Sequence, residues 1–198
     1  MARLLHPVQL PRVNRRGYTI IEFVLVLALL AIVAGMAIPK ISFMRYRQDA
    51  AARYVQTKII AAQQTAMRAA SGPTNVLLIF DYSSSRMRIV EDTNGNGAAD
   101  AAERAPSWRL PEGASFAIPP TTVDGATAYY ATGSGLTTLS AGPALTFYPS
   151  GSASGNAFIY VGLPNGRTDA LRAIEFSGST ARTRLWRYLN GAWRRDSL

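Results

Sequence analysis

The hydrophobic pattern of the chain begins with one unbroken apolar run near the N-terminus. From Tyr18 to Ile38 there are 21 residues, and Glu22 is the only charged one. A helix that rises about 1.5 Å per residue would reach across a hydrocarbon layer of roughly 30 Å. The run therefore predicts a transmembrane helix half over 18–38.

Beyond Pro39 the apolar positions take a helical spacing of three, four or seven residues, with charged residues between them. This pattern predicts an amphipathic helix half over 39–71 that continues the first one. Ser71-Gly72-Pro73 should end it. The expected buried stripe consists of Met44, Ala51, Val55, Ile59, Ala62, Ala66 and Ala69.

After Pro73 the pattern changes to alternation with period two, in short runs rich in Val, Ile, Phe and Tyr. The expected fold class is α+β, with the long N-terminal helix packed on an antiparallel β head over 72–198. We expect a loose loop over 133–143 and turns at Ser83-Ser84-Ser85 and Asn165-Gly166. The expected strands are Asn75–Asp81, Arg86–Glu91, Ser107–Leu110, Ala128–Ala131, Ala144–Tyr148, Ala157–Gly162, Leu171–Phe176 and Arg182–Leu189.

The charge of the first 17 residues differs from that of the rest of the chain. This segment contains four arginines and no acid, which by the positive-inside rule keeps it cytoplasmic and places the head on the other side of the membrane. The net charge of the whole chain is +9, but without the leader 17 basic residues face 12 acidic ones, a net charge of +5. Much of the apparent basicity therefore belongs to the leader.

The residue inventory argues against catalysis. The chain has no cysteine, and its one histidine, His6, lies in the leader, so Ser-His and Cys-His schemes are excluded from the remainder. The carboxylates of Asp81, Asp169 and Glu175 show no acid–base spacing. We therefore expect that the protein is not an enzyme and requires no cofactor.

Glu22 is the unusual residue of the apolar run. A carboxylate within a spanning helix costs about 2.5 kcal/mol or more unless a cation meets it. If the chain were cut after Gly17, the new α-amino group of Tyr18 would lie just over one helical turn from Glu22. The amine could equally face Glu22 of a neighbouring copy and neutralise two charges at once.

The stretch Gly17-Tyr18-Thr19-Ile20-Ile21-Glu22, followed by the apolar run, resembles the class III signal of type IV pilins and pseudopilins. It departs from the pattern Gly-Phe-Thr-Leu-Ile-Glu at Tyr18 and Ile20. The resemblance implies cleavage after Gly17 by an inner-membrane prepilin peptidase, N-methylation of Tyr18 and a role for Glu22 in subunit docking. The alternative is a secretory signal peptide cleaved near Gly35-Met36-Ala37, which leaves Glu22 without a purpose.

The order of the head segments is similar to that of the GspH/FimT family of minor pseudopilins and minor pilins. Phe147-Tyr148-Pro149-Ser150-Gly151 leads into a strand, and an Arg-x-Arg strand closes the chain. The resemblance implies a single-pass inner-membrane protein with a periplasmic head. Its role would be structural, as a subunit at or near the tip of a type II secretion pseudopilus, with other pilins and an inner-membrane assembly platform as partners.

The segment 92–103 fits the calcium-loop pattern D-x-[DN]-x-[DN]-G-x5-E. A strand precedes it where an EF-hand has a helix, so the alternative is a polar hairpin tip whose Asn-Gly pairs form turns. Calcium prefers six to eight oxygen ligands. The candidate ligands are Asp92, Asn94, Asn96, the carbonyl of Ala98, Asp100 and Glu103.

Arginines and aromatic residues alternate near the C-terminus. Arg182, Arg184 and Arg187 are candidates for contacts with nucleic-acid phosphates, next to Trp186 and Tyr188. Some minor pilins of the resembled family bind DNA for uptake through a Gly-Arg-x-Arg element, which here is Ala181-Arg182-Thr183-Arg184 without the glycine. The alternative to DNA binding is a final strand with arginines on its solvent face or paired to acids of neighbouring subunits.

Overall fold

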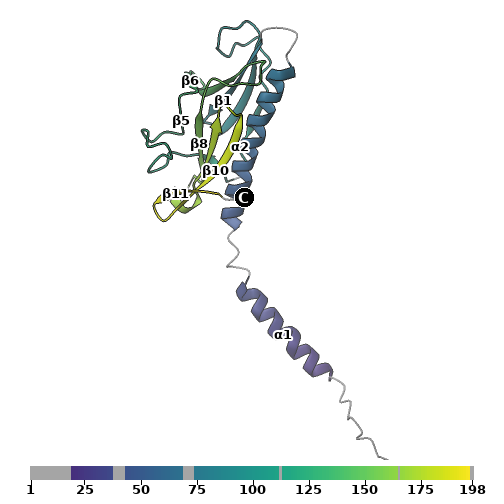
Figure 1. Ribbon diagram of the computed structural model, residues 1–198. Coiled ribbons are helices and arrows are strands. Elements are labelled where there is room, and N and C mark those ends of the chain that lie inside the picture. Colours follow the sequence, from purple (N-terminus) through teal and green to yellow (C-terminus); the bar gives the residue numbers. More distant parts are fainter. Residues whose placement is uncertain (1–18, 38–42, 69–73, 112, 165, 197–198) are drawn as a thin grey trace, which may run out of the picture. The chain divides into compact units, whose positions relative to one another are not determined.

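The computed structural model describes residues 19–37, 43–68, 74–111, 113–164 and 166–196. Contacts divide the chain into two compact units, residues 1–42 and 43–198. The first contains helix α1 (Ile20–Ala37), and the second contains helix α2 (Phe43–Arg68) and all the strands (Figure 1). The second unit therefore joins the predicted amphipathic helix half to the predicted β head.

Helix α1 begins at a reciprocal cap. The backbone N–H of Glu22 donates to Thr19 Oγ1 at 3.3 Å, and the N–H of Thr19 donates to Glu22 Oε2 at 3.4 Å, which is the capping-box arrangement. The apolar side chains from Ile20 to Val33 are exposed all around this helix. The predicted segment 18–38 is longer, and its two end residues lie outside the described residues.

Within the described residues, every helix falls short of the length and apolarity that a membrane crossing requires.

Helix α2 buries the stripe that its spacing predicts. Ala51, Val55, Ile59, Ala62 and Ala66 are at most 1% exposed, so this part of the prediction is confirmed. The side chains of Met44 and Ala69, at the two ends of the predicted stripe, lie outside the described part.

Two antiparallel sheets form the rest of the second unit. The first has the order β3-β2-β1-β7-β6, and the second has the order β11-β10-β9-β8-β4, with β5 also paired to β8. The strands of the first sheet are β1 (Asn75–Asp81), β2 (Arg86–Asp92), β3 (Ser107–Arg109), β6 (Leu136–Leu139) and β7 (Gly142–Phe147). Those of the second are β4 (Ser115–Phe116), β5 (Ala131–Thr132), β8 (Ala157–Gly162), β9 (Arg172–Ser177), β10 (Arg182–Leu189) and β11 (Ala192–Arg195).

The core lies where α2 meets both sheets. Val55 and Ile59 of α2 belong to one buried cluster with Leu78 of β1 and Ile174 of β9. Aromatic rings fill the same cluster: the rings of Phe147 and Phe176 meet edge to face, with centroids 5.5 Å apart. The predicted α+β class, a helix packed on an antiparallel head, is therefore confirmed.

The sequence-based boundaries are correct for three strands and wrong in one loop. The bounds of β1, β8 and β10 are those predicted. The expected loose loop over 133–143 instead contains β6 and the start of β7, which pair with Leu136 opposite Leu145. Strand β6 lies at a sheet edge and is only partly buried, so it lacks the alternation that marks a half-buried strand.

Other differences concern short strands. The strand predicted over Ala128–Ala131 is the two-residue β5, shifted toward the C-terminus. Strands β4 and β11 were not predicted, because two to four residues are too few to show a period. The turn at Ser83-Ser84-Ser85 is present between β1 and β2, while Asn165 of the other predicted turn lies outside the described residues.

Candidate functional site

The predicted processing segment is described only from Thr19 onward. Gly17 and Tyr18, the predicted cleavage and methylation positions, lie outside the described residues, as does the whole leader 1–17. The carboxylate of Glu22 accepts the N–H of Thr19 in the capping box. Thr19 and Glu22 thus fix the start of α1, and the predicted pairing of Glu22 with the Tyr18 amine stays a prediction.

The Asp-Asn loop after β2 folds around the side chains of Asp92 and Asp100. Asp92 is fully buried, and its carboxylate accepts the N–H groups of Asn96 at 3.1 Å and Gly97 at 2.9 Å. Asp100 Oδ2 accepts the side-chain amides of Asn94 at 2.6 Å and Asn96 at 2.7 Å. Four of the predicted calcium ligands are therefore brought together.

Glu103 closes the same loop from its far end. Its two oxygens accept the N–H groups of Thr93 at 2.9 Å and Asp100 at 3.1 Å. Among the described residues, no three His, Asp or Glu side chains are grouped as a metal site. Because each predicted carboxylate already accepts N–H groups, the loop closes on itself as a polar hairpin tip, and calcium binding stays a prediction.

The C-terminal arginines are divided between the two faces of β10. Arg182 and Arg184 are exposed, and Arg184 Nη1 lies 3.5 Å from Glu175 Oε1. Arg187 points to the opposite face, where it pairs with Asp49 at 3.3 Å and Asp196 at 3.0 Å. The structure therefore brings Arg182 and Arg184 together and separates Arg187 from them.

Sequence reasoning missed the ion pair that joins α2 to the second sheet. Arg172 is 2% exposed, and its Nε donates to Asp49 Oδ1 at 2.6 Å. Next to Asp49, Gln48 is fully buried, and its amide has no hydrogen-bond partner among the described residues. In the sequence, the signal was a charged residue among apolar ones in each element, Asp49 in α2 and Arg172 in β9. Such a signal does not show which charged residue the other one pairs with.

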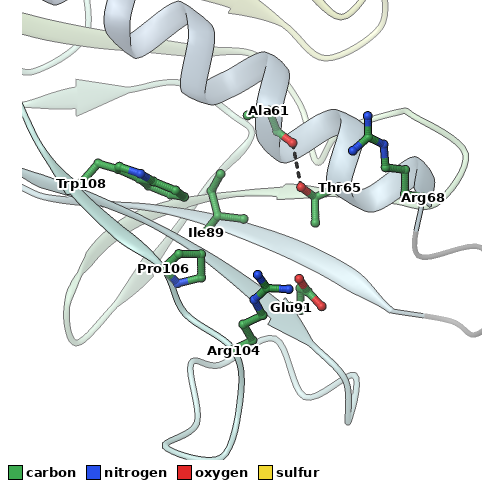
Figure 2. Close-up of a pocket in the computed structure, with 8 residues that line it drawn as sticks. All are labelled: Ala61, Thr65, Arg68, Ile89, Glu91, Arg104, Pro106 and Trp108. Carbon is green, nitrogen blue, oxygen red and sulfur yellow. Dashed lines mark hydrogen bonds between the residues drawn. The ribbon is translucent and has the colours of Figure 1, made fainter.

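An open groove of about 520 Å³ runs between α2 and the edge of the first sheet (Figure 2). The helix contributes Ala61, Thr65 and Arg68, and the floor includes Glu91. Trp108 lies at the strand side, and Nζ of Lys58, a residue of α2 outside the lining, lies 3.7 Å from the centroid of its ring. Burial lowers the pKa of Lys58. The lining thus supplies charge through Glu91, Arg104 and Arg68, and aromatic surface through Trp108.

The scattered carboxylates that sequence analysis names each have a local partner. The pKa of Asp81 is lowered: burial raises it, but hydrogen bonds from Ser84 and Ser83 outweigh that effect. The pKa of Asp169 is lowered chiefly because Arg167 donates to it. Glu175 Oε2 accepts the indole N–H of Trp186 at 2.8 Å. They lie on separate elements, so they do not form one site.

Two solved structures of the minor pseudopilin EpsH from the type 2 secretion system of Vibrio cholerae share a general likeness with the chain. One aligns with a TM-score of 0.46 at 12% identity, over 71% of this chain and 97% of that one. The other aligns with a TM-score of 0.47 at 13% identity, over 71% of this chain and 94% of that one.

Sequence comparisons match the chain to a curated relative and to a family model. The pilin-like protein PilA1 of Thermus thermophilus is 32% identical over 90 residues, which cover 46% of this chain and 56% of the relative, so the match spans about half of that protein's length. The family model for the prokaryotic N-terminal methylation motif matches residues 12–38. Residues 12–38 therefore carry a prokaryotic N-terminal methylation motif.

Proposed function

We propose that this protein is a structural subunit of a periplasmic filament, assembled from the inner membrane after cleavage at Gly17 and methylation of Tyr18. The observation that carries the proposal is the match of residues 12–38 to the N-terminal methylation motif. The position of Glu22, five residues after Gly17 at the start of an apolar run, supports it. Prepilin peptidase is the partner that such processing requires, and other pilins are the partners within the filament.

Within this class we favour a minor pseudopilin at or near the tip of a type II secretion pseudopilus. The similarity of the head to the GspH/FimT pattern supports this assignment. An exposed helix face supports assembly: Ile60 and Met67 are each 44% exposed and lie seven residues apart on α2, so they occupy one face two turns apart. Apolar side chains on one exposed face suit contact with the helices of neighbouring subunits.

The alternative is a type IV pilus minor pilin that binds DNA for uptake. Arg182 supports it, because this side chain is exposed and makes no ion pair among the described residues. Arg184 is shared with Glu175, and Arg187 holds Asp49 and Asp196 on the other face. We prefer the secretion role because a phosphate-binding strip would retain at most two of its three predicted arginines.

Complementation of a deletion strain tests both roles in the same cells. Restored export with the wild-type chain, and its loss with Glu22→Ala, is the result that the secretion proposal expects. DNA uptake should be equal with the wild-type chain and with Arg182→Ala/Arg184→Ala. If uptake depends on the gene and on these arginines while export does not, the alternative is correct.

A further inference from the structure

The end of the second unit where α2 begins carries exposed cations. Arg45, Tyr46 and Arg47 follow each other in the first turns of α2, and all three are exposed, Tyr46 by 76%. The guanidinium of Arg47 lies close to Gly113, since a Cβ on this glycine would be 3.6 Å from its Nη1. This end therefore presents two arginines on either side of an exposed aromatic ring.

The C-terminal strand adds two more cations at the same end. Arg187 bridges Asp49 of α2 and Asp196, which directly follows β11. This bridge ties the end of β11, which carries the exposed Arg194 and Arg195, to the start of α2. We define the arginine surface as Arg45, Tyr46, Arg47, Arg194 and Arg195.

Two acids among the described residues at this end, Asp49 and Asp169, are already engaged by other arginines. Asp49 pairs with Arg172 and Arg187, and Asp169 pairs with Arg167. The pKa of Asp169 is lowered mainly by its hydrogen bond from Arg167, and Arg45 adds a smaller lowering, so Arg45 lies within electrostatic range of this acid. In the described ranges, none of the four arginines of the arginine surface forms an ion pair.

We propose that the arginine surface binds the phosphates of anionic phospholipid head groups at the membrane that anchors the chain. This inference rests on the proposed membrane anchoring. Guanidinium groups bind phosphate oxygens through paired N–H groups, and an aromatic side chain such as Tyr46 suits the interface between head groups and water. The surface would hold the head against the bilayer before the subunit enters a filament.

Position in the chain favours a membrane over nucleic acid as the partner. In the sequence, five residues separate α1 from α2, so a chain anchored through α1 would keep Phe43 within roughly 20 Å of the membrane. Arg182 and Arg184, the candidates for DNA contact, lie at the opposite end of β10. Thr183, between them, accepts a hydrogen bond from Gln56, which lies beyond the first turns of α2. Among the described residues, Arg45 and Arg47 are thus the cations that follow the proposed anchor most closely in the sequence.

The experiment uses the full chain in vesicles and one fluorescent label. Because the sequence has no cysteine, Ala50→Cys provides a unique label on α2 one turn beyond Tyr46. Gln64→Cys provides the matched control on the same helix face, about 21 Å farther along the axis. Vesicles of phosphatidylcholine alone, or with phosphatidylglycerol, carry a small fraction of lipid with a nitroxide on the head group as quencher.

Quenching of the Ala50→Cys label should be greater in the anionic vesicles than in the neutral ones, whereas the Gln64→Cys label should show no difference. Arg47→Gln/Arg194→Gln/Arg195→Gln should lower the Ala50→Cys quenching to the neutral-vesicle level. Arg68→Gln/Arg104→Gln/Arg182→Gln removes the same charge elsewhere and should leave it unchanged. Raising the salt from about 0.1 M to about 1 M should abolish the difference, because the Debye length falls from about 10 Å to about 3 Å.

Flotation of the vesicles separates failure of this inference from failure of the proposed anchoring. If the chain floats with both lipid mixtures and the Ala50→Cys label is quenched equally in them, the arginine surface is overturned and the anchoring stays intact. The same holds if both triple variants lose the same amount of quenching. Flotation only with anionic lipid, lost in the first triple variant, supports the surface and contradicts anchoring through α1. If duplex DNA instead binds the wild-type chain in neutral vesicles and the first triple variant does not, the partner is nucleic acid and the proposal is wrong.

Discussion

At the scale of single residues, the ion pair of Arg172 with Asp49 joins the second sheet to α2. The guanidinium is 2% exposed and is held by Asp49 and by the carbonyl of Leu171 at 2.9 Å. Removing one member of a buried pair leaves an uncompensated charge, which costs about 3–5 kcal/mol. We expect Asp49→Asn to lower the free energy of unfolding by an amount near that range, as measured by urea denaturation of the full chain in detergent.

Asp169→Asn is the matched control, because it breaks the pair with Arg167 whose side chains are 53% and 43% exposed. Exposed pairs contribute about 0–1 kcal/mol, so this variant should unfold within that margin of the wild type. Equal effects of the two substitutions would contradict the assignment of Arg172 and Asp49 as the buried link between α2 and the second sheet.

Asp81 gives the turn after β1 a pH dependence. Its carboxylate accepts the N–H and hydroxyl groups of Ser83 and Ser84, and these bonds lower its pKa below the ordinary value despite burial. The stabilisation is therefore fully present above the ordinary aspartate pKa and is lost as the pH falls through the lower, folded value.

Asp81→Asn should consequently lower the free energy of unfolding by about 1 kcal/mol at neutral pH. The difference from the wild type should shrink at acidic pH as the wild-type carboxylate is protonated. Urea denaturation at a series of pH values measures it. A difference that stays constant from neutral pH to about pH 2 would show that the charge of Asp81 is not what holds the turn.

At the scale of elements, helix α2 depends on a single buried stripe. Ile59 is 1% exposed and its neighbour Ile60 is 44% exposed, so the two residues form a matched pair on the inner and outer faces. Ile59→Ala should lower the free energy of unfolding by about 2–5 kcal/mol through the lost contacts and the cavity. Ile60→Ala should change it by no more than about 0.5 kcal/mol. Similar losses for both variants in thermal or urea denaturation would contradict the packing of α2.

The loop of residues 92–103 carries the calcium prediction. Binding would require its carboxylates to exchange N–H partners for the ion, which suits a modest affinity with three carboxylates. The prediction expects calcium to raise the melting temperature of the wild-type chain and to leave Glu103→Gln unchanged, with magnesium as the control ion. If the melting temperature of the wild-type chain is the same with calcium as with magnesium, the loop is a hairpin tip closed by its own hydrogen bonds.

Sequence pattern predicts an element best when burial dictates it. The stripe of α2 and the strands β1, β8 and β10 lie at the core, and their apolar positions show the expected period. Strands β6 and β11 lie at sheet edges and are half exposed, so backbone pairing defines them without leaving a hydrophobic pattern. The Arg172–Asp49 pair joins residues 123 positions apart, a separation across which local pattern carries no information.

At the scale of the whole molecule, we propose a different role for each of the two units. The first carries the methylation motif and an apolar helix for anchoring and assembly, and the second presents a β head with its own core. The processing motif can be read from the sequence without the fold, because a Gly, a Glu at fixed distance and an apolar run are local features. It could not locate the arginine surface, which forms only when the β11 end is tied to α2 through Arg187.

The proposed function depends on one covalent event, the cut between Gly17 and Tyr18. Gly17→Glu is a suitable blocking variant, because a bulky anionic side chain would replace the small residue before the cut. With it, the chain should keep its leader and its four leader arginines, and assembly should fail even if the head folds normally. A blocked leader with unimpaired assembly would contradict the proposed route.

The decisive measurement of this processing is the intact mass and N-terminal sequence of the membrane-extracted chain, produced with and without prepilin peptidase. We predict that the chain begins at N-methylated Tyr18 only when the peptidase is present, and that Gly17→Glu abolishes this product. A chain that begins after Ala37, or one that keeps residues 1–17 when the peptidase is present, would contradict the assignment as a processed filament subunit.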